Sequence, residues 1–362
     1  MHIARLLATH YKNIATADLS FSEKMNVLYG NNGEGKTNLL DALYYLSVCK
    51  SFFPISDKDI ITYSASQTTL YGEYVMDSGI TEKVACQVDK AQGKTFKRNG
   101  KTYARISEHV GLIPVVMVSP QDTSLVYGSG EERRRYMNFL MAQTDSDYLR
   151  TVLEYGKLLV QRNKMLKADS YEPEYKAALD DNLCQRAQII FAKRAELCAM
   201  LHPYVKEYYR LLSDDKEPID LVYQSDLNKE PMAALLQQYA DRDRDFHYTS
   251  VGVQRDDVQF TLHGHPLKVC GSQGQQKTFL LALKLAQFAL LRQLKGMSPI
   301  LLLDDVFDKL DAHRVASLLQ LVAQADFGQI FLTDSNKVRI EKMVATLGGP
   351  SRFFNVEKGV IA

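Results

Sequence analysis

The sequence of 362 residues lacks an excess of charge of either sign, because 44 Lys and Arg face 43 Asp and Glu and leave a net charge of +1. Bulk charge therefore predicts no polyanionic partner, and any nucleic-acid site must be a local patch. The five cysteines include no C-x-x-C pair. That pattern favours buried free thiols in a reducing compartment over disulfides or a zinc site.

Long apolar runs are also missing. The first seven residues lack the extended apolar stretch of a signal peptide, and the most apolar later run, 279–291, is interrupted by Lys284. We therefore expect a cytoplasmic, soluble protein with no membrane segment. Internal repeats and low-complexity tracts are absent from the sequence, and its 46% hydrophobic content can form one large core or two modest ones.

A phosphate-binding loop is the most informative feature present. The loop fits the pattern G-x-x-x-x-G-K-[ST], in which backbone N–H groups surround phosphate oxygens. It follows the apolar run 27–29 and precedes a helical pattern, as this motif requires. Its residues, the first set of candidate nucleotide ligands, are Gly30, Asn31, Asn32, Gly33, Glu34, Gly35, Lys36 and Thr37.

A second half of the same site is predicted far along the chain. The apolar run 300–303 reads as a buried strand, and it ends in Asp304 and Asp305. A carboxylate in this position is typical of a magnesium ligand. The two segments together predict a site for a nucleoside triphosphate and Mg²⁺.

Hydrophobic periodicity divides the chain into three parts. Residues 1–123 are predicted to hold mostly strands around one helix, with Asn99-Gly100 as a hairpin turn because both of its central positions need positive φ. Residues 124–247 are predicted to form an inserted helical arm, and residues 248–362 return to an α/β pattern. The predicted strands cover 69–75, 84–88, 94–97, 113–118, 300–303 and 330–333, and the predicted late helix covers 275–294.

The arm is predicted to consist of two antiparallel helices. Helices of about 20 to 25 residues would be only about 30 to 38 Å long, so we expect a short projection. Pro203 is expected to end or kink the second of them.

A third segment narrows the class. Ser272, Gln273 and Gly274 stand at the start of an amphipathic helix, one strand before the carboxylates. A helix N-terminus offers unpaired N–H groups to an anion, although an ordinary helix cap with a flexible glycine has the same pattern. In this position the segment resembles the signature motif of ABC-type ATPases, commonly S-G-G-Q, which closes over the γ-phosphate bound by another subunit. The segment 307–311 is similar to the loop that follows in that class, and Asp311 stands at its acidic end.

With these motifs in place, nearly the whole chain resembles the RecF family of bacterial recombination-mediator ATPases. The resemblance includes the phosphate loop, the signature and four further blocks. These blocks are Val118-Ser119-Pro120-Gln121-Asp122, Leu125-Val126-Tyr127-Gly128, Glu131 to Tyr136 and Gln161-Arg162-Asn163. The chain departs from the family at Gln254, where His is usual, at Lys277, where Arg is usual, and at Gln121, where Glu is common.

The resemblance implies the fold class and the site roles. The fold would be an α/β ABC-type P-loop ATPase head, with a mixed sheet, flanking helices and an antiparallel β subdomain, interrupted by the helical arm. Lys36 would pair with the β- and γ-phosphates of ATP, while Thr37 and Asp304 would hold Mg²⁺. Asp305 would position the attacking water; it is one methylene shorter than the Glu of most ABC enzymes, so we expect slow hydrolysis. Gln121 is a candidate γ-phosphate or metal sensor, with a plain loop amide as the alternative, and Thr333 is a candidate switch residue.

DNA contact is predicted on the hairpin around Asn99-Gly100. A basic ribbon without acids gives a sequence-independent phosphate footprint, although a solvated hairpin tip has the same composition. The candidate residues are Lys94, Lys97, Arg98, Lys101 and Arg105.

The function implied by the resemblance is an ATP-gated DNA clamp. ATP would hold two copies face to face as a homodimer on single-stranded, gapped or junction DNA, and the pair would help to load RecA with RecO and RecR. The ATPase subunit of a membrane transporter is the main alternative, against which stand the long helical insertion, Asp305 and the basic hairpin. A small-molecule kinase would have no use for the signature helix.

Overall fold

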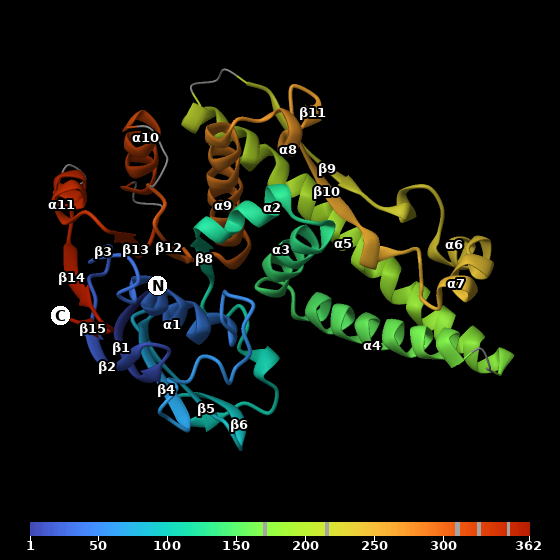
Figure 1. Ribbon diagram of the computed structural model, residues 1–362, viewed down its shortest axis with the longest axis horizontal. Helices are drawn as coiled ribbons and strands as arrows, with labels where there is room; N and C mark the ends of the chain where they lie inside the picture. The colour runs from blue at the N-terminus through green and yellow to red at the C-terminus, as the bar shows by residue number, and fades with distance from the viewer. Residues whose placement is uncertain (169–171, 214–216, 308–311, 324–326, 346–347) are drawn as a thin grey trace. The chain divides into compact units, whose positions relative to one another are not determined.

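The computed structural model describes residues 1–168, 172–213, 217–307, 312–323, 327–345 and 348–362 (Figure 1). The chain forms two compact units, the first of Met1–Asp122 with Lys284–Ala362 and the second of Thr123–Leu283. Residues 248–283 thus group with the helices of the second unit, whereas the sequence pattern placed them with the ATPase part. The reason is strand pairing: β10 (Asp257–Leu262) pairs with β9 (Ile219–Gln224). The division at 123 and 247 stays a proposal about functional domains.

The core of the first unit is a six-stranded sheet that is parallel except at one edge. Its strand order is β15-β14-β3-β13-β12-β8. The bounds are β15 Val360–Ile361, β14 Ser351–Glu357, β3 Met25–Tyr29, β13 Ile330–Asp334, β12 Ile300–Leu303 and β8 Val115–Val118. Strands β8 and β12 are apolar throughout and fully buried, as strands covered on both faces must be.

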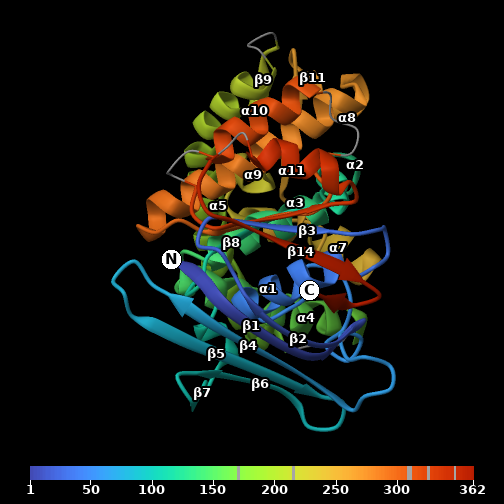
Figure 2. The same ribbon diagram turned by 90° about the vertical axis from the view of Figure 1, so that its left-hand side faces the viewer.

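A second, antiparallel sheet has the order β2-β1-β4-β5-β6-β7. Its strands are β2 Ile14–Ser20, β1 His2–Tyr11, β4 Gln67–Val75, β5 Thr81–Asp89, β6 Gly93–Arg98 and β7 Lys101–Thr102. Buried and exposed positions alternate along β4 and β5, as expected when one face packs and the other meets water. Helix α1 (Lys36–Val48) contacts strands of both sheets (Figure 2). Eleven of its 13 residues are buried. The predicted combination of a mainly parallel sheet and an antiparallel sheet is therefore confirmed.

The predicted hairpin is confirmed in detail. Asn99 and Gly100 have φ angles of 50° and 81°, and Arg98 pairs with Lys101 across them. Both central residues therefore lie in the left-handed region that this two-residue turn requires.

Three further helices belong wholly or partly to the first unit. They are α9 Gln273–Lys295, α10 Ala312–Ala323 and α11 Lys337–Ala345. The buried side chain of Gln329 joins the two sheets: it accepts from the N–H of Ile3 and donates to its carbonyl, each at 2.8 Å.

The second unit is mainly helical. Its helices are α2 Ser124–Tyr127, α3 Gly130–Ala142, α4 Ser146–Ala168, α5 Pro173–Ser213, α6 Met232–Gln238, α7 Ala240–Phe246 and α8 Leu267–Cys270. Ion pairs join Arg162 and Glu154 of α4, and Asp145 just before it, to Asp180, Arg186 and Lys193 of α5, respectively. The partner numbers run in opposite directions, which confirms the predicted antiparallel pair.

The helical region differs from expectation in the length of its second helix and in containing a strand. Helix α5 has 41 residues and does not end at Pro203, because the buried side chains of Leu201, Val205 and Tyr209 keep packing on both sides of the proline; the alternative of a kink at Pro203 stays a prediction. At 1.5 Å per residue its length is about 62 Å, well above the predicted 38 Å. The region also contains a strand, β9, in the three-stranded sheet β11-β10-β9, in which β11 is His265–Pro266.

All five cysteines are free thiols. Cys49, Cys86 and Cys198 are buried as predicted, whereas Cys270 is exposed. In the part of the chain that the structure describes, each helix is too short or too polar to cross a bilayer.

Candidate functional site

The phosphate loop joins β3 to α1 and depends on its glycines. Gly30 and Gly35 have φ angles of 151° and 115°, which favour glycine. A Cβ on Gly30 would lie 2.2 Å from the carbonyl oxygen of Val356, and a Cβ on Gly35 would lie 2.7 Å from the Asn13 amide. Glycine is therefore required at both positions for two reasons: the positive φ angles, and the close approach of other segments of the same chain.

Lys36 begins helix α1 with its ammonium group folded back over the loop. Its Nζ donates to the carbonyl oxygens of Gly30 at 2.6 Å and Asn31 at 2.8 Å. Burial lowers the pKa of Lys36, while Asp305 and Asp304 oppose that shift by favouring the charged form. The ammonium is thus held beside the loop by weak carbonyl partners that phosphate oxygens can replace.

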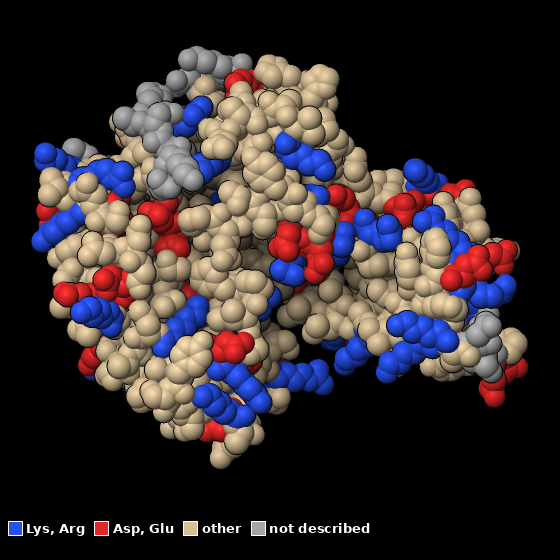
Figure 3. Space-filling model, viewed as in Figure 1, with Lys and Arg blue, Asp and Glu red and all other residues tan. Residues whose placement is uncertain are grey.

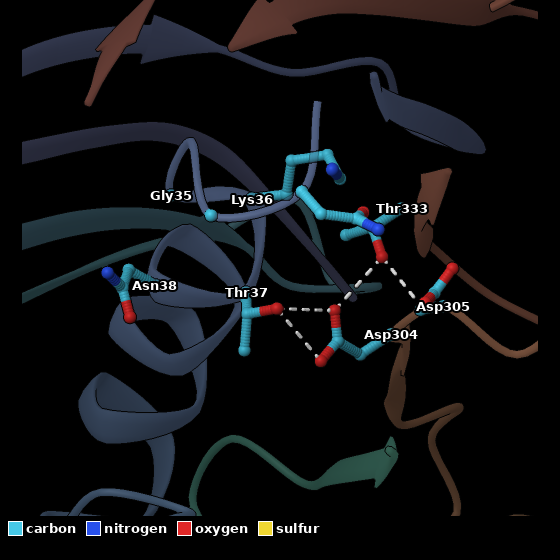
Figure 4. A pocket seen from close by; sticks show the side chains of 9 residues that line it. Gly35, Lys36, Thr37, Asn38, Asp304, Asp305 and Thr333 are labelled. Carbon is cyan, nitrogen blue, oxygen red and sulfur yellow. Dashed lines mark hydrogen bonds between the residues drawn. The ribbon is translucent and has the colours of Figure 1, made fainter. Parts of the chain in front are cut away.

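Thr37 and Asp304 meet from opposite ends of the sequence (Figure 4). The Thr37 hydroxyl lies 2.9 and 3.0 Å from the two carboxylate oxygens of Asp304. Thr333 donates to the same carboxylate at 3.0 Å, and its hydroxyl accepts the backbone N–H of Asp305 at 2.8 Å. Burial raises the pKa of Asp304, while the hydrogen bonds from Thr37 and Thr333 oppose the rise. The parallel pairing of β12 with β13 and of β13 with β3 brings these residues to one edge of the sheet, the edge formed by the carboxyl ends of the parallel strands.

A pocket of about 320 Å³ lies over this edge. Its lining comes entirely from the first unit and comprises Asn32, Gly33, Gly35, Lys36, Thr37, Asn38, Asp304, Asp305 and Thr333. Asn38 was not singled out from the sequence, although it directly follows the loop threonine. Gly30, Asn31 and Glu34 belong to the loop outside this lining; the carbonyl of Glu34 accepts from Gly359 at 2.8 Å.

The oxygen groups in the pocket suit magnesium. A hydroxyl and a carboxylate already in contact are the hard ligands that Mg²⁺ prefers, and the ion usually keeps several waters beside phosphate oxygens. Thr37 and Asp304 would hold the ion, which would neutralise charge on the phosphates.

Gln121 lies in the turn Pro120–Thr123 that follows β8, and its side chain is exposed. The turn is anchored by Asp122, whose carboxylate pairs with Lys284 at 2.6 Å while both side chains are buried. The structure brings Gln121 to the same sheet edge as Asp304, because β8 pairs in parallel with β12. Its sensor role stays a prediction.

The signature segment caps helix α9 in the second unit. The N–H of Ser272 donates to Oε1 of Gln275 at 2.7 Å, and the N–H of Gln275 donates to Oγ of Ser272 at 3.2 Å, which is a reciprocal capping box. Ser272 and Gln273 are exposed, whereas Gly274 is half-buried. Nε2 of Gln275 donates at 2.5 Å to Glu217, which also accepts from Tyr209 at 2.7 Å. Glu217 could not be identified from local sequence pattern, because this contact spans 58 residues.

The basic hairpin is partly neutralised. Lys94 pairs with Asp57 at 2.8 Å, and Arg98 makes two bonds to Glu82 at 2.6 and 2.8 Å. Hydrogen bonding to Arg98 lowers the pKa of Glu82, although burial opposes the shift. Lys97, Lys101 and Arg105 are exposed. The patch thus has fewer available cations than the sequence suggested.

Two predicted positions remain, Gln254 and Asp311, and the structure describes the first of them. Gln254 is held inside the second unit, where its Nε2 donates to the Val251 carbonyl at 2.6 Å and its Oε1 accepts from Tyr155. Asp311 lies outside the described residues.

Comparison with known proteins agrees with this geometry. The family described as RecF/RecN/SMC N terminal domain matches residues 2–359. Among solved structures, the recombination mediator protein RecF with ATP from the RecFOR pathway superposes with a TM-score of 0.90 at 24% identity, covering 100% of this chain and 97% of that one. An Smc head bound to the C-terminal winged-helix domain of ScpA gives a TM-score of 0.59 at 13% identity, covering 100% and 96%. Fold and site together define an ABC-type ATPase head of the SMC class.

Two relatives fix the family more narrowly. The DNA replication and repair protein RecF of Parabacteroides distasonis is 42% identical over 361 residues, covering 100% of this chain and 99% of its own length. The DNA replication and repair protein RecF of Flavobacterium johnsoniae is 39% identical, covering 98% and 100%. The chain belongs to the RecF family.

Proposed function

We propose that this protein is an ATP-gated DNA-binding clamp that acts in DNA replication and repair. ATP and Mg²⁺ join two copies face to face, and the dimer binds single-stranded, gapped or junction DNA. In this role it aids the loading of RecA together with RecO and RecR. Membership in the RecF family favours this function over the ATPase subunit of a membrane transporter.

One observation carries the proposal. All residues that line the phosphate pocket belong to the first unit, while the signature Ser272 is exposed at the start of α9 in the second. Within the described residues, the phosphate pocket of the first unit and the exposed start of α9 would be complementary halves of one site, because a helix N-terminus favours an anion. Two copies related by a two-fold axis would complete two such sites at once.

The capped start of α9 is suited to this task. The side chain of Gln275 accepts the N–H of Ser272 and donates to Glu217, so both of its ends are anchored. The serine hydroxyl therefore keeps a fixed direction. That hydroxyl accepts one hydrogen bond within the cap and retains its own proton to donate to a γ-phosphate oxygen. Thr333 would report the state of the nucleotide, since it touches both Asp304 and the backbone of Asp305.

DNA retention across nucleotide states tests the proposal. The wild-type protein should bind a gapped duplex more tightly with ATP than with ADP or without nucleotide. The Ser272→Arg variant should bind ATP with wild-type affinity yet gain no DNA affinity from it, because the larger side chain blocks the second copy. Equal DNA binding in all three nucleotide states by the wild-type protein would reject ATP gating.

Hydrolysis should be slow. Asp305 is one methylene shorter than glutamate, so it would hold the attacking water less closely, and we expect turnover without DNA below about 10 per second, the median enzyme rate. Phosphate release measured with saturating ATP and Mg²⁺ checks this rate, with Asp305→Asn giving the background. A faster, DNA-independent rate contradicts the view of ATP as a switch.

The two exposed hairpin lysines are expected to contact DNA phosphates. The Lys97→Glu/Lys101→Glu variant should bind duplex DNA more weakly, with a salt slope reduced by about 1 for each lysine. Binding titrations at several salt concentrations measure the slope. The matched control is Lys342→Glu/Arg352→Glu, which reverses two exposed cations elsewhere on the first unit. An unchanged slope for the hairpin variant would remove the hairpin from the DNA site.

A further inference from the structure

An aromatic pair is presented to solvent at the end of α7 in the second unit. Phe246 and Tyr248 are 49% and 41% exposed, and their rings stack with centroids 5.7 Å apart and planes at 17°. The guanidinium of Arg242 lies 5.3 Å from the Phe246 ring. The outer face of the Tyr248 ring can accept another flat group, while Arg242 lies over the Phe246 ring.

The segment that carries the rings is rigidly held. His247 between them has a φ of 56°, and this left-handed residue turns the chain sharply at the end of α7. In the two residues that follow Tyr248, the N–H of Thr249 donates to Asn163 at 2.9 Å and the N–H of Ser250 donates to Asp243 at 2.7 Å. Asp243 is fully buried against Arg162 at 2.6 Å. The exposed rings therefore stand on an ordered base, so little entropy would be lost on binding.

Exposed cations lie on the neighbouring helix. Lys157, Lys164 and Lys167 are exposed on α4, and their spacing of seven and three residues places them on one helix face. The sequence from 155 to 168 contains no Asp or Glu. Figure 3 shows Lys and Arg side chains along the edge of this unit where Figure 1 places α4.

The lysines and the rings are close in the fold. Nδ1 of His247 lies 3.3 Å from the carbonyl oxygen of Leu166, the residue before Lys167. Among the described residues of α7, the exposed acids are Asp241, which pairs with Arg244 at 3.2 Å, and Asp245.

We propose that Phe246, Tyr248 and Arg242, with Lys164 and Lys167, form a second nucleic-acid site that binds a single strand by stacking on an unpaired base. This surface is called the stacking platform below. Rings accept any base on their faces, while lysines follow the phosphates without reading sequence. A duplex keeps its bases stacked on each other, so only an unpaired base can use the rings. The inference rests on the proposed function in that it gives the DNA-binding protein a separate contact for single strands.

Binding of a fluorescent 15-residue oligothymidine, measured by anisotropy, tests the stacking platform. The measurement is made without nucleotide in the Lys36→Met background, so that it does not depend on ATP gating. The Phe246→Ala/Tyr248→Ala variant should bind about 5- to 160-fold more weakly, the range expected for losing one stacked base. The Phe246→Tyr/Tyr248→Phe variant keeps both rings and should stay within about twofold of its parent.

A 15-base-pair duplex is the matched ligand, and its affinity should not change in the alanine variant. Equal loss for strand and duplex would overturn base stacking in favour of a general effect, and no loss for the strand would overturn the site. Photocrosslinking of the unmutated protein to an iododeoxyuridine oligonucleotide avoids any dependence on variant folding. The crosslink should fall on Phe246 or Tyr248, and a crosslink confined to other segments contradicts the proposal.

The outcomes separate this inference from the proposed function. If the stacking platform is wrong, ATP should still change the affinity of the wild-type protein for gapped DNA. If ATP gating is wrong, the alanine variant should still lose single-strand affinity in the absence of nucleotide.

Discussion

Replacing Lys36 by methionine should weaken ATP binding by about 30-fold or more. Losing one partner of a buried, hydrogen-bonded charge pair costs about 2 to 5 kcal/mol. Lys36 is only 7% exposed, its ammonium already lies over the loop, and among the described residues that line the pocket it is the one Lys or Arg. Methionine is also unbranched and is one atom shorter than lysine, so the substitution removes the charge and the donors with little change in shape.

Equilibrium binding of a fluorescent ATP analogue measures the effect. Lys83→Met, at an exposed lysine of β5, is the control and should bind as the wild type does. Retention of wild-type affinity by Lys36→Met would mean that the loop does not hold the triphosphate tail.

Replacing Arg194 by methionine should lower the free energy of unfolding by about 3 to 5 kcal/mol, the usual cost of breaking a buried ion pair from one side. Arg194 is 4% exposed and donates to Asp256 at 2.6 Å, to the Val253 carbonyl at 2.6 Å and to Asn138 at 3.1 Å. Its loss leaves the Asp256 carboxylate buried with Tyr223 as a neutral partner. Urea denaturation measures the change. Arg150→Met, which breaks a surface pair with Asp147, should cost less than about 1 kcal/mol.

The Arg194 variant also has a predicted pH dependence. Burial raises the pKa of Asp256, and the charge of Arg194 opposes that rise, so the pKa should rise further in the variant. Between an ordinary carboxyl pKa near 4 and the raised value, the folded state binds more protons than the unfolded chain, so stability increases as pH falls. The difference in the free energy of unfolding between the variant and the wild type should therefore narrow from pH 8 toward pH 5. A gap that widens on acidification contradicts this assignment.

The parts of the fold that follow from local pattern were predictable. The run at 300–303 forms β12 with the predicted bounds, because a short, wholly apolar run that ends in polar residues is typical of a buried strand. The turn at Asn99-Gly100 was predictable because its chemistry depends on two residues alone. The contact between Thr37 and Asp304 was predictable because Thr37 lies at the start of α1 and Asp304 directly follows β12, and the sequence pattern identified both elements.

Features that depend on distant partners were not predictable. Lys94 and Arg98 looked free in sequence, yet Asp57 and Glu82 neutralise them from other segments. Strand β9 is short and begins Ile219-Asp220, so only its pairing with β10 distinguishes it from a loop. Helix α5 passes Pro203 because packing on both sides offsets one lost hydrogen bond, and that packing comes from other elements.

The central claim is that two copies share each nucleotide site, and mixing two inactive variants tests it most directly. Lys36→Met lacks the phosphate-loop cation but keeps its signature, whereas Ser272→Arg keeps the loop and loses the signature. Alone, neither should dimerise or hydrolyse ATP. Mixed in equal amounts, they should recover up to about half of wild-type hydrolysis, because only mixed dimers form and each contains one intact site of two. A mixture as inactive as its components, or full activity of Ser272→Arg by itself, would contradict the shared site.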